Sequence, residues 1–278
     1  MSSNQVLATS IAGFPALVTT NESTRPPLLF IHGAFVTHEG FAPWMEALAE
    51  KGWRSIAPSR RGRLGLGPAQ ARGLTTADYV EDTQAVISAL GETPILVGHS
   101  LGGLIAQKIA ESGKARALAL LAPAPAAMLT AQAVALPAYL PMFPRILAGQ
   151  PIVPSCAGCS RIALNRVPEA ERPALHATLV HESGKVYREL IFGSIKVDPA
   201  KVKCPVLVVG GAEDRIVSTT LMRWTAERYG AELKLYADHA HWLIGEPGWQ
   251  TIAADLAAWL DRAVPANLAS LTTKHQAA

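Results

Sequence analysis

The sequence predicts an α/β fold in which a mostly parallel sheet is wrapped by helices and interrupted by an inserted helical cap. Three observations lead to this prediction. Short apolar runs, typical of buried parallel strands, alternate with segments of helical periodicity. This alternation stops between residues 123 and 194, where prolines gather in residues 123–154, and then resumes. Finally, the G-x-S-x-G pattern of residues 98–102 lies where an apolar run passes into a helical segment.

The expected elements fall on both sides of this interruption. Strands are expected at residues 6–11, 14–19, 28–31, 54–58, 95–97, 117–121, 205–210 and 233–236, the first two forming a hairpin at one edge of the sheet. Helices are expected at 41–51, 75–90, 101–109, 219–229 and 248–262, with helical fragments at 131–140, 161–166, 169–182 and 186–192. Residues 1–123 and 196–263 are therefore assigned to the core, 124–195 to the cap and 264–278 to a flexible tail.

Composition narrows the classes of protein that fit. The 278 residues are 49% hydrophobic and 17% charged, enough apolar material for a sizeable core. The net charge of +3 is too small to indicate binding to nucleic acid or to an anionic membrane. No apolar run reaches the roughly 18 residues of a membrane span, and the first residues lack the features of a signal peptide. We therefore expect a soluble, cytoplasmic enzyme with a small-molecule substrate and no nucleic-acid partner; the oligomeric state stays open.

Ser100 is the candidate nucleophile. At a sharp turn between a strand and a helix, a serine side chain stands clear of the backbone above the carboxyl end of the strand. Gly98 and Gly102 leave room for the turn and for close packing of the strand and the helix. The surrounding pattern therefore predicts a nucleophile elbow at Ser100.

Two backbone N–H groups are expected to form an oxyanion hole beside this serine. The N–H of Leu101 lies at the start of the expected helix, where it can donate to a developing negative charge. The second donor is expected just after the third strand, where His32-Gly33 lets the backbone turn outward. Ala34 is the first choice for this donor and Phe35 the alternative.

A serine needs a base to become a strong nucleophile, and the base needs an acid that orients it. In open α/β sheets functional groups gather at the carboxyl ends of strands, so the loops there supply the candidates. Asp214 follows the seventh expected strand, with Glu213 as the alternative acid. His239 and His241 both follow the last expected strand, and their spacing alone does not choose between them. Either histidine gives the chain order Ser, Asp, His.

With these residues in this order, the chain resembles the α/β-hydrolase fold family. The resemblance rests on four stretches that span most of residues 28–262: FIHGAF, LVGHSLGG, LVVGGAEDRIV and ADHAHWLIGEPGW. Members commonly have Gly-His-Trp where this chain has Ala240-His241-Trp242, which implies that His241 is the base. An apolar run after His241 can also anchor its loop, whereas His239 follows Asp238, which can hold it in a surface pair. 

The same resemblance indicates the chemistry. It implies a serine hydrolase that cleaves a small to medium carboxylic ester, thioester or lactone through an acyl-enzyme, with no cofactor and no metal. Ser100 makes the relatives with an aspartate nucleophile, haloalkane dehalogenases and epoxide hydrolases, poor matches. The alternatives are C–C bond hydrolysis, a lyase or a cofactor-free oxygenase on the same triad, or a ligand receptor that kept the fold. The residues expected to line the substrate pocket are Phe35, His99, Met128, Leu136, Met142, Phe143 and Trp242.

Two further features have a structural interpretation. The C-x-x-C motif of Cys156 and Cys159 is typical of zinc or redox sites, but only Cys204 remains as a further cysteine, so structural cysteines are favoured. Where the family often has Asp after the fourth strand, this chain has Ser59 followed by three arginines in a glycine-rich loop: Arg60, Arg61 and Arg63. A solvated loop is favoured for these arginines over contact with an acidic substrate.

Overall fold

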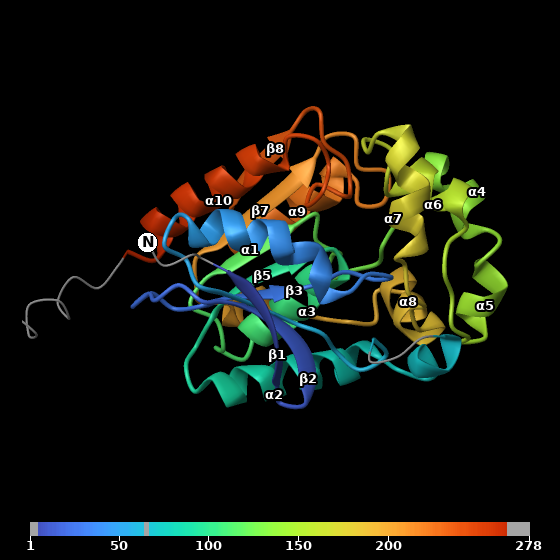
Figure 1. The fold of residues 1–278 in the computed structure, drawn as a ribbon. Coiled ribbons are helices and arrows are strands. Elements are labelled where there is room, and N and C mark those ends of the chain that lie inside the picture. Colours follow the sequence, from blue (N-terminus) through green and yellow to red (C-terminus); the bar gives the residue numbers. More distant parts are fainter. Residues whose placement is uncertain (1–4, 64–66, 266–278) are drawn as a thin grey trace, which may run out of the picture.

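The computed structural model describes residues 5–63 and 67–265, in which eight strands form one mostly parallel sheet (Figure 1). The strand order is β1-β2-β4-β3-β5-β6-β7-β8. Strands β1 and β2 form the expected antiparallel hairpin at one edge, β2 pairs antiparallel with β4, and all later pairings are parallel. The bounds are β1 Val6–Ile11, β2 Phe14–Thr19, β3 Leu28–Ile31, β4 Ser55–Pro58, β5 Ile95–His99, β6 Leu118–Leu121, β7 Val206–Gly211 and β8 Glu232–Tyr236.

Helices cover both faces of the sheet. Figure 1 shows α1 (Ala42–Ala49) and α10 (Trp249–Ala263) together over one face, and α2 (Thr76–Leu90) and α3 (Leu101–Ala110) over the other. Helix α9, Thr219–Tyr229, packs on β7 and β8. Because helices cover both faces, every residue of β3 to β7 is buried, in agreement with their largely apolar sequences. The predicted α/β fold class is confirmed.

The segment between β6 and β7 contributes no strand to the sheet. Figure 1 shows its helices gathered at one end of the sheet. Those helices are α4 Leu136–Tyr139, α5 Phe143–Leu147, α6 Cys156–Ile162, α7 Arg172–Ala177 and α8 Gly184–Ile191. Short 3₁₀ turns, some inside this segment and some outside it, are η1 His38–Phe41, η2 Pro68–Ala71, η3 Ala133–Ala135, η4 Glu169–Glu171 and η5 Pro199–Lys201. The division into core and cap stays a prediction.

Local capping explains where the structure departs from the expected helices. The fragment expected at 161–166 is wrong, because the hydroxyl of Ser155 accepts the N–H of Gly158 and starts α6 earlier. The fragment expected at 169–182 ends at Ala177, after which the chain runs to an antiparallel bridge between Ile152 and Glu182. Helix α5 was not expected.

Helix α2 shows the opposite case, a start and a stop that the sequence does signal. Thr75 and Asp78 form a reciprocal capping box, and Gly91 ends the helix in the left-handed conformation. Most of the expected tail, residues 266–278, lies outside the described residues. Within the described ranges, no helix combines the length and apolar character needed to cross a membrane.

Candidate active site

Ser100 lies on the turn between β5 and α3. Its backbone has φ of 53° and ψ of −119°, a conformation that non-glycine residues rarely adopt. A Cβ at Gly102 would overlap the carbonyl oxygen of Ile31 in β3, and one at Gly98 would lie 2.7 Å from the Cα of Gly103. These close approaches require glycine on both sides of the serine, so the local sequence holds the side chain in a strained, protruding position.

His241 joins Ser100 to Asp214. The hydroxyl Oγ of Ser100 lies 2.9 Å from Nε2 of His241, and Nδ1 of His241 lies 2.8 Å from Oδ2 of Asp214. When Nδ1–H donates to the carboxylate, Nε2 is left free to accept the serine proton. The three side chains come from the loops after β5, β7 and β8, which meet at the carboxyl edge of the sheet.

The second oxygen of Asp214 is held by the backbone. Its Oδ1 accepts the N–H groups of Ile216 at 2.7 Å and Val217 at 2.9 Å, while the side chain is fully buried. Glu213, the alternative acid, is exposed and lies 3.4 Å from Arg166. The structure therefore places Asp214, and not Glu213, against the imidazole.

His239 has a different partner. Its Nδ1 lies 3.2 Å from Oε2 of the buried Glu246, and the expectation of a surface pair between His239 and Asp238 is wrong. Glu246 also accepts the N–H groups of Ala240 at 2.8 Å and Trp242 at 3.1 Å, which are the residues on either side of His241. Burial raises the pKa of Glu246.

Sequence reasoning missed this role of Glu246. The signal was an acidic residue four positions beyond Trp242, inside an otherwise apolar loop that Pro247 follows. The carboxylate holds both neighbours of the imidazole, so it fixes the loop from which His241 projects.

The loop after β3 lies directly beside the nucleophile. A Cβ at Gly33 would lie 3.2 Å from Cβ of Ser100, so only glycine fits this approach without displacement. Ala34 and Phe35 follow, both lining the cavity that contains Ser100, and Phe35 has φ of 63°. The N–H of Leu101 is at the first position of α3, as expected.

An apolar cavity opens over Ser100 and His241. Four of the residues expected in the pocket line it: Phe35, His99, Met142 and Trp242. The other three, Met128, Leu136 and Phe143, line a second cavity. The two cavities share a wall made of Tyr139, Tyr187 and Ile216.

The family assignment follows from a match between the chain and a family model described as the alpha/beta hydrolase family, over residues 28–254. The chain belongs to the alpha/beta hydrolase family. The matched range includes the serine, the acid and the histidine described above.

Solved structures of similar fold agree with this assignment. A monoacylglycerol lipase of Paleococcus ferrophilus has a TM-score of 0.68 at 20% identity, with 92% of this chain and 98% of that chain covered. A 2-hydroxy-6-oxo-6-phenylhexa-2,4-dienoate hydrolase of Rhodococcus sp. strain RHA1 has a TM-score of 0.69 at 19% identity, with 92% and 98% covered. A soluble variant of the monoglyceride lipase of Saccharomyces cerevisiae has 0.72 at 16% identity, with 96% and 97% covered.

His99 of this hydrolase supports the loop that carries His241. Its Nε2 lies 2.9 Å from the carbonyl oxygen of His241, and its ring contacts Trp242 edge-on. Complete burial and the nearby His241 lower the pKa of His99 to about 3, so the ring is neutral at ordinary pH. A neutral ring that donates from Nε2 to the carbonyl holds His241 in place without adding charge to the site.

Neither the cysteines nor the basic loop of the hydrolase supplies a group of the Ser100–His241–Asp214 relay, although Cys159 lines the cavity over Ser100. Cys156, Cys159 and Cys204 are all free thiols, and the described ranges contain no cluster of three or more His, Cys, Asp or Glu side chains suited to a metal ion. The expectation of a solvated basic loop is wrong for Arg60 and Arg63, which are both buried.

Proposed function

We propose that this hydrolase cleaves a small to medium carboxylic ester, thioester or lactone through an acyl-enzyme on Ser100. One observation carries the proposal: the hydrogen-bonded relay from Asp214 through His241 to Ser100, with distances of 2.8 and 2.9 Å. A serine with both a base in hydrogen-bond contact and a buried acid behind that base is equipped for attack on a carbonyl carbon.

The proposed reaction has two halves. His241 takes the hydroxyl proton of Ser100 as Oγ attacks the substrate carbonyl, and the N–H groups of Ala34 and Leu101 stabilise the oxyanion that forms. The tetrahedral adduct then collapses to an acyl-enzyme, and His241 passes its proton to the departing alcohol, thiol or lactone oxygen. In the second half, water attacks the acyl carbonyl while His241 accepts a proton from that water. The bond between the acyl carbon and Oγ then breaks, His241 returns the proton to Oγ of Ser100, and the carboxylic acid leaves.

The apolar lining supports a substrate with an apolar acyl or alcohol part. Phe35, Met142 and Trp242 line the cavity that contains Ser100, and we propose that residues 124–195 act as a cap that selects among such groups. Tyr139 adds one polar group, since its buried hydroxyl has no hydrogen-bond partner in the described part of the chain. Burial, followed by the nearby Asp214, raises the pKa of Tyr139, so the phenol stays a neutral donor.

Turnover of p-nitrophenyl esters of graded chain length tests this function. Wild-type protein should hydrolyse them, and Ser100→Ala should lower the rate by roughly 10⁴-fold or more while the protein stays folded. Tight ester binding with negligible turnover would overturn the proposal in favour of a receptor. Labelling of Ser100 by a fluorophosphonate without any ester turnover would instead favour other chemistry on the triad, such as C–C bond hydrolysis.

A further inference from the structure

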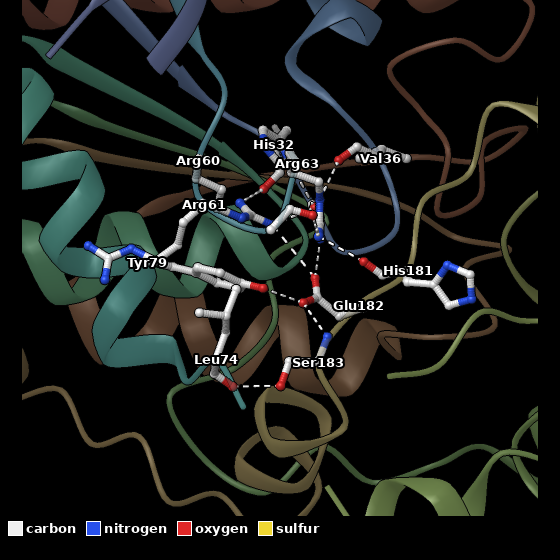
Figure 2. A network of polar contacts seen from close by, with 12 residues as sticks. His32, Val36, Arg60, Arg61, Arg63, Leu74, Tyr79, His181, Glu182 and Ser183 are labelled. Carbon is white, nitrogen blue, oxygen red and sulfur yellow. Dashed lines mark hydrogen bonds and ion pairs between the residues drawn. The ribbon is translucent and has the colours of Figure 1, made fainter. Parts of the chain in front are cut away.

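Four buried side chains form a cluster beneath the loop that follows β3. Figure 2 shows this arginine cluster, which consists of Arg60, Arg63, Tyr79 and Glu182. Glu182 accepts hydrogen bonds from Nη2 of Arg63 at 2.5 Å and from the hydroxyl of Tyr79 at 2.6 Å. Nη2 of Arg60 lies 3.8 Å from the same carboxylate, and its guanidinium lies over the ring of Tyr79 at 4.4 Å.

Two guanidinium groups therefore share one buried carboxylate. Burial and the neighbouring Arg63 lower the pKa of Arg60 to about 10, which still leaves it charged at neutral pH. Burying a charge lowers the stability of the fold unless the charge is paired and hydrogen-bonded. The hydrogen-bond acceptors of the two arginines therefore show what holds them in place.

Both terminal nitrogens of Arg60 donate hydrogen bonds to backbone carbonyl groups. Nη1 donates to the carbonyl oxygen of His32 at 2.7 Å, and Nη2 donates to that of Gly33 at 2.8 Å. In a planar trans peptide the C=O and the following N–H point in opposite directions. Holding the Gly33 carbonyl therefore fixes the direction of the Ala34 N–H, the proposed oxyanion donor.

The far side of the same loop is held by the segment that contains Glu182. The N–H of Val180 donates to the carbonyl of Phe35 at 2.7 Å. Arg63 donates from Nε to the carbonyl of Val36 at 3.2 Å and from Nη1 to that of His181 at 2.8 Å. The arginine cluster and Val180 thus bind the carbonyl groups on both sides of Ala34, including that of Phe35, whose φ of 63° is unfavourable without support.

We propose that Arg60 is a positioning residue for the oxyanion hole. We also propose that Glu182 couples the placement of Arg60 to the packing of residues 124–195 against the core. The inference rests on the proposed function, since an oxyanion forms only if Ser100 attacks a carbonyl or an equivalent centre. Glu182 lies in the segment between β6 and β7, whereas Arg60 and Arg63 follow β4. When residues 124–195 pack against the core, the Glu182 carboxylate compensates both guanidinium groups and the loop after β3 is held. When this segment moves away from the core, that loop loses the support.

The expected signature is a loss in kcat with little change in KM. Oxyanion donors act on charge that develops in the transition state, so misaiming one leaves ground-state binding largely intact. Replacing Arg60 with Met removes both carbonyl contacts, and Arg60→Lys keeps the charge but loses the two-pronged geometry.

The neighbouring arginine provides the matched control. Arg61 bonds to three carboxylates on α2, those of Asp78, Glu81 and Asp82, and its side chain is 36% exposed. Arg61→Gln should lower the melting temperature and leave kcat within about twofold, because in the described part of the chain the Arg61 side chain contacts α2 and not the loop after β3.

The test measures kcat, KM and the second-order rate of fluorophosphonate labelling of Ser100 for each variant. Arg60→Met should lose at least about tenfold in kcat and in labelling rate with KM within about threefold, and Arg60→Lys should fall between it and wild type. Glu182→Gln, which changes the size of the side chain little, provides an independent test if Arg60→Met does not fold. It should show a smaller loss in kcat and in labelling rate, again with little change in KM. An equal loss in Arg61→Gln, or a loss seen only in KM, would overturn the inference.

The two proposals fail in different ways. Absence of both ester turnover and Ser100 labelling in wild-type protein would contradict the proposed function itself. Normal turnover and labelling in wild type, with unchanged kcat in folded Arg60→Met and Glu182→Gln, would leave that function standing and contradict the positioning role.

Discussion

At the scale of single residues, the two histidines after β8 differ in what they contact. His241 lies between Ser100 and Asp214, whereas His239 pairs with the buried Glu246. Because only the base takes part in the transition state, His241→Ala should lose roughly 10⁴-fold in kcat/KM. His239→Ala should keep activity within about tenfold of wild type. Both variants are measured on one activated ester, and a large loss at His239 with near-normal activity at His241 would reverse the assignment.

The residues of the relay could be predicted because each belongs to a local pattern. Ser100 lies in a five-residue motif, and Asp214 and His241 each follow an expected strand within a few positions. Glu182 could not be predicted, because its arginine partner Arg63 is 119 positions away in the sequence and their contact depends on how the whole segment packs. The favoured interpretation of a solvated loop failed for the same reason: three clustered arginines give no sequence signal for buried acceptors.

At the scale of elements, the helices of residues 124–195 divide the expected pocket into two cavities. Met142 lines the cavity over Ser100, and Met128 lines the second cavity with 56% of its surface exposed. Met142→Ala should shift the preference between short and longer esters by several fold, since a methylene in a pocket is worth about 1–3 kcal/mol. Met128→Ala, the matched control, should shift it less than twofold.

Relative kcat/KM values over a series of p-nitrophenyl esters check this expectation. Equal effects of Met142→Ala on every ester would show that the residue packs the cap without selecting substrate. A larger shift at Met128 than at Met142 would mean that substrate occupies the second cavity.

The ends of elements were predicted best where the local sequence contains a helix-capping pattern or a terminating glycine. The capping box at Thr75 and the left-handed Gly91 bound α2 nearly as expected. In residues 124–195 the elements are short, several contain proline, and they pack mainly on one another, so helical periodicity over a few residues misplaced α6 and missed α5.

At the scale of the whole molecule, two buried histidines make stability depend on pH. The folded-state pKa of His99 is about 3, against an ordinary value of 6.5, and burial lowers the pKa of His32 as well. Between these values the unfolded chain binds protons that the folded protein does not. The free energy of unfolding therefore rises with pH through this window, and it is lost on acidification by about 1.4 kcal/mol per pH unit for each such group.

Replacing His99 with Gln isolates one of these groups. Gln lacks the titrating ring, so the slope of unfolding free energy against pH between about pH 4 and pH 6 should fall by roughly one proton equivalent. Urea denaturation of both proteins at several pH values measures the two slopes, and carboxylate contributions common to both cancel. Parallel slopes would mean that His99 binds a proton in the folded state at the same pH as in the unfolded chain.

Acylation of Ser100 is the step on which the whole proposed reaction depends, and rapid-quench mass spectrometry can detect it. Wild-type protein mixed with p-nitrophenyl acetate is quenched in acid within the first turnover, digested and mapped. We expect one acetyl group on the peptide that carries Ser100, formed together with a burst of p-nitrophenol, and neither in Ser100→Ala. Burst and turnover with acetyl on another residue, or turnover that persists in Ser100→Ala, would contradict the acylation of Ser100.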